Sequence, residues 1–295
     1  MAVLLFTACD SGNMEITIPD LVWGRHGVGE GRFQRPRAIA IDDENQVYIV
    51  DKKARVQVFT SEGNYIKEWT TPISDTGKPT GISIGIDGNV LVADTHYYRV
   101  LIYSPDGELL RKIGGDLGSE PGQFEYVTDV VQDSLRNFYI SQYGEHDFIQ
   151  KYSPEGEFLT RWGGHGHNPG QFLRPQCLLM DRKNQLWVAD AGNDRIQVFD
   201  THGNLIRVWG ESGDQPGQLS YPHGLDFDSQ GNILVCERRN SRIQKFTPTG
   251  QSLGCWGRPG RDLGEVWNPW SLAVNRMDCV FVLDTYNHRV QRLIF

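Results

Sequence analysis

Short apolar segments alternate with turn residues along the whole chain after residue 14. Runs such as V-Y-I-V at 47, L-W-V-A at 186 and I-L-V-C at 233 are separated by polar stretches that contain glycine. Short runs of β-branched and aromatic residues bounded by turn signals are typical of β-strands. The 3.6-residue period of an amphipathic helix is hard to find in the same stretch. The pattern therefore predicts an all-β protein.

The strand segments recur with a regular period. An element of the form R-[IV]-Q-V-F, with variants, returns six times, and its aliphatic second position is held by residues that stand 44, 49, 47, 47 and 47 positions apart: Val56, Val100, Ile149, Ile196, Ile243 and Val290. A period of this length with about four short strands in each unit is typical of a propeller blade. We therefore expect a six-bladed β-propeller of four-stranded blades.

The two ends of the chain complement each other. The last unit stops after its third strand at residues 292–295, whereas residues 16–24, I-T-I-P-D-L-V-W-G, match a fourth strand that ends in Trp-Gly. We expect this N-terminal strand to complete the sixth blade and close the ring, because closure removes the exposed edges of an open sheet. Residues 15–295 then form a single propeller domain.

Residues 1–9, M-A-V-L-L-F-T-A-C, are set apart from the repeats. Small residues before Cys9 resemble a bacterial lipobox, in which the cysteine is cleaved and lipidated. The run is short for a signal, as it would be if the start codon were placed too far downstream. The resemblance predicts a truncated lipoprotein signal and tether over residues 1–14, a lipid on Cys9, and an extracytoplasmic location in the bacterial cell envelope. The alternative is an unprocessed tail.

Several spaced features of the repeat identify a family. Each unit opens with P-x-G-[IL] or a variant, continues through a G-N turn and V-x-D-x-x-N-x-R-[IV]-Q-V-F, and closes on W-G. Together they resemble the NHL repeat family over roughly residues 15–295. The resemblance implies the six-bladed fold. It leaves the function open, because propellers of this kind include protein-binding and RNA-binding modules and have lyases and lactone hydrolases among their relatives.

One position of the repeat varies where the others are constant. The residue after the proline position of each first strand is, in order along the chain, Arg37, Thr80, Thr128, Gln176, His223 and Trp270. Fourteen residues after each stands an acid or an amide, so we expect facing pairs such as His223 and Glu237 around one mouth of the central channel. A position that varies while the rest of the repeat stays constant favours a rim that contacts a ligand. By contrast, the recurring acids (Asp51, Asp94, Asp190 and Asp284) and the arginines downstream of them suggest a structural role.

His223 is the sharpest of the varied residues. The string His223-Gly224-Leu225 resembles the metal-binding histidines that peptidyl-amidating lyases of this propeller type carry at the same blade position. The resemblance implies a divalent ion, Ca or Zn, held by His223 and Glu237 in the channel, although those enzymes use three such histidines and this chain has one. Alternatively, Glu237 orients His223 as a general base, or the two form a hydrogen-bonded pair in a watery channel.

Blade three departs from the common pattern, because S-Q-Y-G-E-H-D-F at 141 replaces the acid and the arginine of the other blades. Its Tyr143, together with Tyr97 and Tyr98 of blade two, predicts an aromatic patch on the same mouth. Exposed tyrosines favour recognition of a partner or a polar ligand. Loss of the pattern by simple decay is the alternative.

Composition narrows the classes of partner. The 295 residues carry a formal net charge of −8, which argues against nucleic acid as a general partner because phosphate binding needs a positive surface. Arg35, Arg37, Arg238 and Arg239 are interleaved with acids on the predicted mouth. No C-x-x-C pair appears, so a zinc ribbon is not expected, and Cys236 stands where the other blades have small or apolar residues, which predicts a buried free thiol.

These observations predict a recognition scaffold that binds a protein, a peptide or a small molecule at the channel mouth. The chain is expected to be a monomer that meets the membrane through its lipid anchor alone. The expected contacts are residues Arg37, Thr80, Gln176, His223, Glu237, Trp270, Tyr97, Tyr98 and Tyr143. One alternative is a metal-dependent lyase or hydrolase of the amidating-lyase or lactonase type that uses His223 and Glu237. Another is a purely structural envelope protein.

Overall fold

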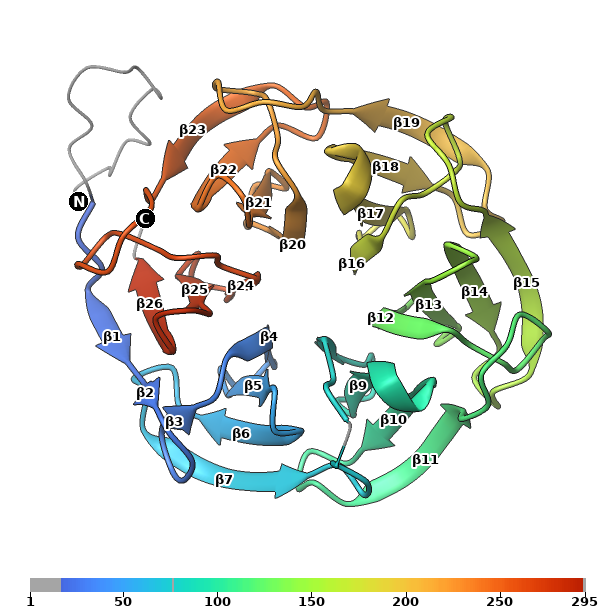
Figure 1. Cartoon of the computed structure of the whole chain (residues 1–295), viewed down its shortest axis with the longest axis horizontal. Coiled ribbons are helices and arrows are strands. Elements are labelled where there is room, and N and C mark those ends of the chain that lie inside the picture. The colour runs from blue at the N-terminus through green and yellow to red at the C-terminus, as the bar shows by residue number, and fades with distance from the viewer. Residues whose placement is uncertain (1–16, 76, 294–295) are drawn as a thin grey trace.

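The computed structural model describes residues 17–75 and 77–293. Six four-stranded antiparallel sheets stand radially around a central axis, so the predicted six-bladed propeller is confirmed (Figure 1). The lipidation predicted at Cys9 lies outside the described residues and stays a prediction. No helix in the described part of the chain is long and apolar enough to cross a membrane.

Five blades are built from consecutive strands, named from the channel outward. Blade 1 contains β4 (Pro36–Ile41), β5 (Val47–Asp51), β6 (Arg55–Phe59) and β7 (Tyr65–Thr70). Blade 2 contains β8 (Gly81–Ile84), β9 (Val90–Asp94), β10 (Arg99–Tyr103) and β11 (Leu109–Gly114). Blade 3 contains β12 (Tyr126–Gln132), β13 (Phe138–Tyr143), β14 (Phe148–Tyr152) and β15 (Phe158–Gly163). Blade 4 contains β16 (Pro175–Met180), β17 (Leu186–Asp190), β18 (Arg195–Phe199) and β19 (Leu205–Trp209). Blade 5 contains β20 (Pro222–Phe227), β21 (Ile233–Glu237), β22 (Arg242–Phe246) and β23 (Ser252–Trp256).

The sixth blade joins the two ends of the chain. Its inner strands are β24 (Ser271–Val274), β25 (Val280–Asp284) and β26 (Arg289–Leu293), and β1 (Leu21–Trp23) pairs antiparallel with β26 as the outer strand. The remaining elements are the short pair β2 (Arg25–His26) and β3 (Arg32–Phe33) and the 3₁₀ turns η1 (Thr95–Tyr97) and η2 (Ala191–Asn193). The indole of Trp23 packs against Phe281 of blade 6 and Phe59 of blade 1, so the closing strand joins both blades.

The hydrophobic core is divided among the blade interfaces. Six clusters of buried side chains lie between successive sheets, each mixing residues of two neighbouring blades. The β-branched strand runs of the sequence fill these clusters because both faces of each twisted sheet meet another sheet. The innermost strands have one edge left for the channel, and that edge positions the candidate site.

The Trp-Gly ending and the glycine turn of the repeat are structural partners across neighbouring blades. A Cβ atom on Gly107 would lie 2.7 Å from the Trp69 ring, and the φ of Gly107 is +87°, a region that favours glycine. The same turn glycine covers a tryptophan of the preceding blade at three further interfaces, in the pairs Gly63–Trp23, Gly203–Trp162 and Gly250–Trp209. The Trp-Gly ending and the glycine turn therefore recur together, because the tryptophan ring of one blade packs against the turn glycine of the next.

His288 contributes a bond to the seam between the last blade and the first. Its Nδ1 atom accepts a hydrogen bond of 3.0 Å from the backbone N–H of Arg35, so the ring must be neutral at that nitrogen. Burial lowers the pKa of His288, and the neighbouring His26 and Arg35 lower it further. The folded state therefore prefers the neutral ring more than the unfolded chain does. This preference stabilises the fold above the unfolded pKa of about 6.5 and is lost as the pH falls below that value.

We expect the His288→Asn variant to lose less stability than the parent chain between pH 7 and pH 5. Asparagine tolerates the left-handed backbone found here (φ 57°) and keeps an acceptor that does not titrate. The difference should be about 1 kcal/mol, the contribution of one hydrogen bond, or a few degrees in the melting temperature. Thermal unfolding of both proteins across this range measures it. Parallel pH profiles would contradict the assignment.

Candidate functional site

A bulge turns the varied residue of the innermost strand out of the sheet ladder. In blades 1, 3, 4 and 5 the register shifts at Arg37, Thr128, Gln176 and His223, so each of these has no partner on the second strand. The expectation that His223 faces Glu237 is therefore wrong, because Pro222 pairs with Glu237 and Gly224 pairs with Cys236. Bulges commonly re-aim side chains near functional sites, and here they separate the rim residues from the acids.

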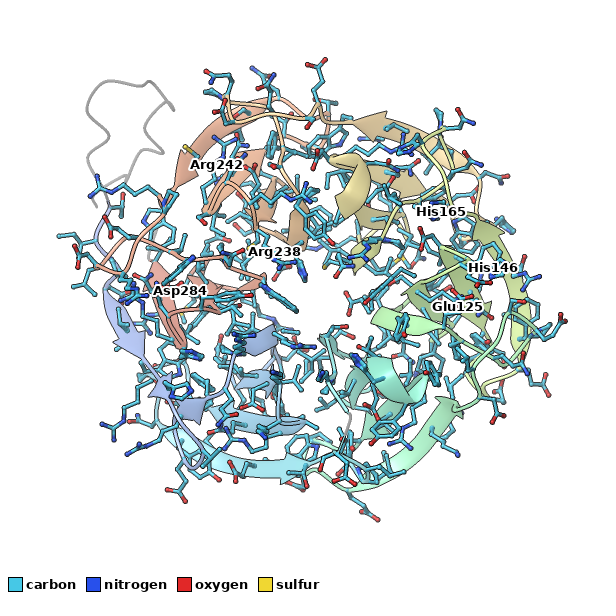
Figure 2. The ribbon with its side chains drawn as sticks, viewed as in Figure 1. Glu125, His146, His165, Arg238, Arg242 and Asp284 are labelled. Atoms are coloured by element: carbon cyan, nitrogen blue, oxygen red, sulfur yellow. The ribbon has the colours of Figure 1, made fainter. Side chains whose placement is uncertain are left out.

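The recurring acids pair with arginines inside their blades, and we call these acids and arginines the frame of the blade. Glu237 is fully buried, and its carboxylate accepts hydrogen bonds from Ser220, Asn240, Arg242 and Gln244. The Arg–acid pairs of blades 1, 2, 4 and 6 are made in the same way, at 2.7 to 2.8 Å, by Arg55–Asp51, Arg99–Asp94, Arg195–Asp190 and Arg289–Asp284. Arg242 and Asp284 accordingly lie within their blades (Figure 2). The structural interpretation of the recurring acids is confirmed.

The rim residues line one cavity along the propeller axis. Arg37, Thr80, Gln176, His223 and Trp270 all contribute to a cavity of about 300 Å³ whose walls are the innermost strands of the six blades. Thr128 is fully buried instead, and its hydroxyl bonds to Ser141 at 2.6 Å within blade 3. Within the described residues, the cavity lining does not include Glu237, Tyr97, Tyr98 or Tyr143.

Trp270 is the centre of a stack on the rim. The His223 ring lies over it with centroids 4.8 Å apart and an interplanar angle of 34°. The guanidinium groups of Arg37 and Arg238 each lie 5.0 Å from the centroid of the same indole. Arg238 comes from the loop after β21 and reaches the edge of the channel (Figure 2). Sequence reasoning placed it among the basic residues of this face but not in the site.

The rim is positively charged although the protein is acidic. Five arginines lie against aromatic rings there: Arg35 on Tyr286, Arg37 on Trp270, Arg174 on Tyr143, Arg238 on Tyr221 and Trp270, and Arg239 on Tyr221. None of the five makes an ion pair with a described acid, because the neighbouring frame acids are already paired. The rim is therefore a concentration of uncompensated positive charge.

Burial strongly affects two of the rim residues. It lowers the pKa of Arg37 to about 10, and the Nε atom of Arg37 is buried without a hydrogen-bond partner, while one terminal nitrogen donates to the Lys78 carbonyl at 3.0 Å. His223 is 4% exposed, and burial together with the nearby Arg238 lowers its pKa to about 3. The imidazole is therefore neutral at physiological pH, and the charge of the rim resides on the arginines.

The predicted aromatic patch is assembled beside this rim. Tyr143 stacks on Tyr126 with centroids 5.2 Å apart, and the rings of Tyr98 and His96 also pack against Tyr126. Tyr97 lies slightly apart, with the Arg99 guanidinium over its ring. The sequence indicated Tyr143, Tyr97 and Tyr98 but missed Tyr126. The same position of the other blades holds Arg35, Lys78, Arg174, Tyr221 and Asn268.

The donor sets do not support the metal site predicted at His223 and Glu237. The carboxylate of Glu237 already accepts hydrogen bonds from four residues, and in the strand register it pairs with Pro222 and not with His223. Within the described residues, the groups close enough to share an ion are Glu125, Glu145 and His146 of blade 3, whose ligand atoms lie within 4.8 Å of one another. Figure 2 labels Glu125 and His146. Both oxygens of the Glu125 carboxylate already contact His146. Oε1 lies 2.9 Å from the ring Nδ1, and Oε2 accepts the backbone N–H at 3.0 Å.

Two carboxylates below the rim escaped the sequence analysis. Asp129 of β12 and Asp226 of β20 line the channel, and burial raises the pKa of each to about 7. Cys177 of β16 lies near both, and its thiol has a pKa well above the ordinary value because of burial and Asp129. Aligning the next inward positions of the six first strands would have revealed them, because the other blades carry no acid there.

Six radial four-stranded sheets around a central channel define the class of six-bladed β-propellers. Three stretches of the chain match the NHL repeat, residues 172–199, 219–246 and 266–293. The chain is also similar to mouse peptidyl-glycine alpha-amidating monooxygenase, with 31% identity over 187 residues that make up 60% of this chain and 18% of that protein. It also matches human NHL repeat-containing protein 3, with 25% identity over 53% of this chain and 49% of that protein.

Among solved structures, the fold resembles a gluconolactonase of Xanthomonas campestris, XC5397. The TM-score is 0.69, the sequence identity is 12%, and the match covers 95% of this chain and 98% of the other. At this identity the likeness concerns the fold alone. The chain spans about a fifth of the length of the mouse relative and half that of the human one, so their activities do not transfer with the match.

Proposed function

We propose that this propeller is a recognition module that binds a negatively charged ligand at the mouth of its central channel. The ligand is a small molecule or the acidic end of a peptide or a protein. The observation that carries the proposal is the Arg37 guanidinium, which is largely buried on Trp270, has an unpartnered Nε, and makes no ion pair with any described residue. A buried charge of this kind is costly unless a counter-charge reaches it.

The surroundings of Arg37 suit a carboxylate. Arg238 brings a second guanidinium to the same indole, and guanidinium groups form short, bidentate hydrogen bonds with carboxylates and phosphates. The aromatic rings hold both arginines in place and offer a surface for the apolar part of the ligand. The overall charge of −8 means that this attraction is local, which favours small or narrow anions over a polyanion.

The relatives agree with a ligand of this kind. The name of the mouse relative refers to a peptidyl-glycine, a group that ends in a carboxylate when it stands at a C-terminus. The human NHL repeat-containing protein 3 shows that such repeats also occur in a protein whose name carries no reaction. A binding role therefore fits the repeats without assigning the activity of either relative to this chain.

N-Acetyl-phenylalanylglycine and its C-terminal amide are a matched pair of probes for this proposal. Isothermal titration should show binding of the carboxylate form, and the Arg37→Gln variant should bind it at least about tenfold more weakly, since charge-assisted hydrogen bonds are worth about 1.5–3 kcal/mol. Trp270→Ala should weaken both probes because it removes the stack. Arg182→Gln, which changes an exposed arginine in a turn at the other end of the blade, is the control. Equal binding of the acid and the amide would refute an anion site.

A further inference from the structure

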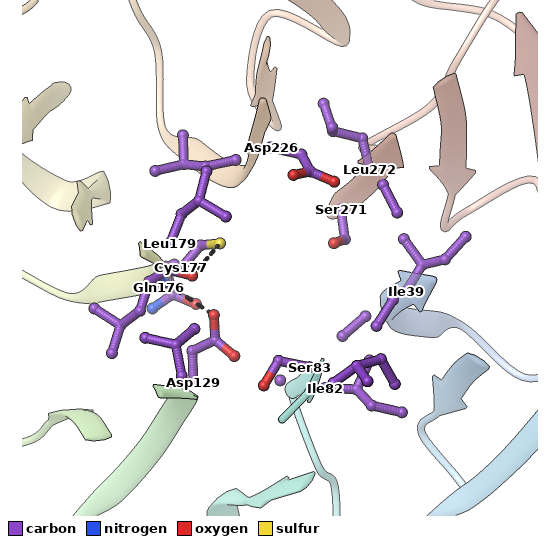
Figure 3. Close-up of a pocket in the computed structure, with 18 of the residues that line it drawn as sticks. Ile39, Ile82, Ser83, Asp129, Gln176, Cys177, Leu179, Asp226, Ser271 and Leu272 are labelled. Atoms are coloured by element: carbon purple, nitrogen blue, oxygen red, sulfur yellow. Dashed lines mark hydrogen bonds between the residues drawn. The ribbon is translucent and has the colours of Figure 1, made fainter. Parts of the chain in front are cut away.

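Below the rim, the channel forms a chamber with a different character. Its walls are apolar side chains of the innermost strands, among them Ile39, Ile82, Leu179 and Leu272, and three polar groups point into it from three blades: Asp129, Cys177 and Asp226 (Figure 3). The first strands of the other blades have alanine, glycine, serine, cysteine or aliphatic residues at the two corresponding positions, and none has an acid. The two carboxylates are therefore specific to this chamber and are not part of the repeat.

Each carboxylate accepts two backbone N–H groups, and Asp129 in addition accepts a hydrogen bond from the Cys177 thiol. Asp129 accepts the N–H groups of Val130 and Leu178, each at 2.9 Å, one on each oxygen. Asp226 accepts those of Phe227 and Val274 at 2.8 and 2.7 Å, again one on each oxygen. An ionised carboxylate has about four acceptor positions, so each group keeps unused capacity on the side of the cavity. Within the described residues, neither carboxylate has an ion-pair partner.

We propose that the chamber binds the protonated amine of a ligand, with the ammonium donating hydrogen bonds to Asp129 and Asp226. An ammonium has three donors and no acceptor, which matches two carboxylates that offer free lone pairs in an otherwise apolar space. The ligand atoms of Asp129, Cys177 and Asp226 do not lie within 4.8 Å of one another, the spacing at which Glu125, Glu145 and His146 could share a metal ion. The three side chains therefore do not form a compact ligand set for a bare ion, which favours an organic cation.

The chemistry of Cys177 agrees with a binding role. Its pKa is raised, so it stays a thiol and faces both carboxylates as a neutral neighbour. The cavity is also lined by polar side chains that carry no charge: Thr80, Ser83, Gln132, Gln176 and Ser271. The Ser83 hydroxyl donates to the Val130 carbonyl at 2.5 Å. The charged groups that line the cavity from the rim side are Arg37 and, when protonated, His223. Among the described residues that line the cavity, Asp129 and Asp226 are the acids, so a cation in the chamber would meet its counter-charge there.

Together the two levels specify the ligand more closely. A rim that attracts an anion and a chamber that attracts a cation fit a small zwitterion, such as an amino-acid-like group, with its carboxylate toward Arg37 and its amine inward. Asp129 follows the varied rim position of its strand by one residue, and Asp226 follows that of its strand by three. Successive residues of an extended strand are about 3.3 Å apart, so both carboxylates lie deeper in the channel than the rim. This inference rests on the proposed function for the orientation of the ligand, but the chamber can be tested separately.

The test compares n-butylammonium with n-butanol, which has nearly the same shape and no charge. At pH 8 we expect n-butylammonium to bind in the millimolar range, and n-butanol at least tenfold more weakly. The Asp129→Asn/Asp226→Asn double variant should lose this preference, while Asp116→Asn, an exposed carboxylate, should keep it. Because both pKa values lie near 7, binding at pH 7 should also release protons, seen as heats that change between two buffers of different ionisation enthalpy.

Proton release by the parent chain keeps the test valid even if the double variant folds poorly. Equal affinity for the amine and the alcohol, or no proton release at pH 7, would overturn the chamber proposal. The rim is tested independently, because Arg37→Gln should leave n-butylammonium binding unchanged or slightly stronger. Loss of anion binding in Arg37→Gln with no amine binding anywhere would support the rim alone.

Discussion

Raising the pH from 5 to 8.5 should destabilise the parent chain more than the Asp129→Asn/Asp226→Asn double variant, by about 2–3 kcal/mol for each carboxylate. Burial raises both pKa values to about 7, whereas the unfolded chain has ordinary aspartates. Between pH 4 and pH 7 the folded state therefore binds more protons than the unfolded state. Its stability falls as the pH rises through that window and levels off above it. Asparagine does not titrate, so the variant lacks this loss.

The absolute stability of the double variant is less informative than its pH profile. Each asparagine places an NH₂ group against one of the two backbone N–H groups that the aspartate accepted, which costs about 1–3 kcal/mol for an unsatisfied donor. Urea unfolding at several pH values separates the constant cost from the pH-dependent gain. Parallel profiles of parent and variant would mean that the two carboxylates titrate normally. Two carboxylates that lower the stability of the fold as they ionise would be typical of a binding site, where function is retained at a cost in stability.

Removing the arginine of one buried Arg–acid pair should strongly destabilise the fold. Arg242→Ala leaves Glu237 fully buried and charged without its cation, and breaking such a pair costs about 3–5 kcal/mol. Arg242 also donates to the carbonyl groups of Asp214, Gln215 and Gln218, so the loop between blades 4 and 5 loses an anchor. Thermal and urea unfolding of the variant should show the loss, with the rim residues unchanged in sequence.

Blade 3 supplies the matched control for this prediction. At the positions of Glu237 and Arg242 it has Gln142 and Phe148, and Gln142 accepts a hydrogen bond from Gln150 at 2.9 Å. The double variant Glu237→Gln/Arg242→Phe copies this neutral arrangement, so it should be more stable than Arg242→Ala even though it changes more atoms. A double variant that is as unstable as the single one would show that the loop anchor, and not the buried charge, dominates.

The architecture could be predicted from local signals. Apolar runs of strand length, turn glycines and a period near 47 residues can be recognised from short-range sequence information. Because the repeat occurs six times, an irregular copy can be interpreted from the others. The Trp-Gly ending and the glycine turn were visible as a pattern, and Cys236 was correctly predicted to be a buried free thiol. The varied position after the proline was also found, because repeats provide an internal comparison.

Two parts of the site depended on geometry that the repeat does not encode. The bulge on the innermost strand shifts the register by one residue, so His223 turns toward Trp270 while Glu237 stays in the frame, and the expected His–Glu pair is not formed. A spacing of 14 residues cannot reveal such a shift. The unpaired state of Arg37 is equally invisible, since it depends on which acids the other arginines have already taken.

By itself, then, the sequence determined the repeat, the strands, the ring of six blades and the position on each blade that can vary. Only the tertiary structure decided what those positions do together. Asp129 and Asp226 are 97 residues apart in the chain and become neighbours of one cavity because the ring brings every first strand to the axis. Their raised pKa values follow from that shared burial, which no single blade possesses.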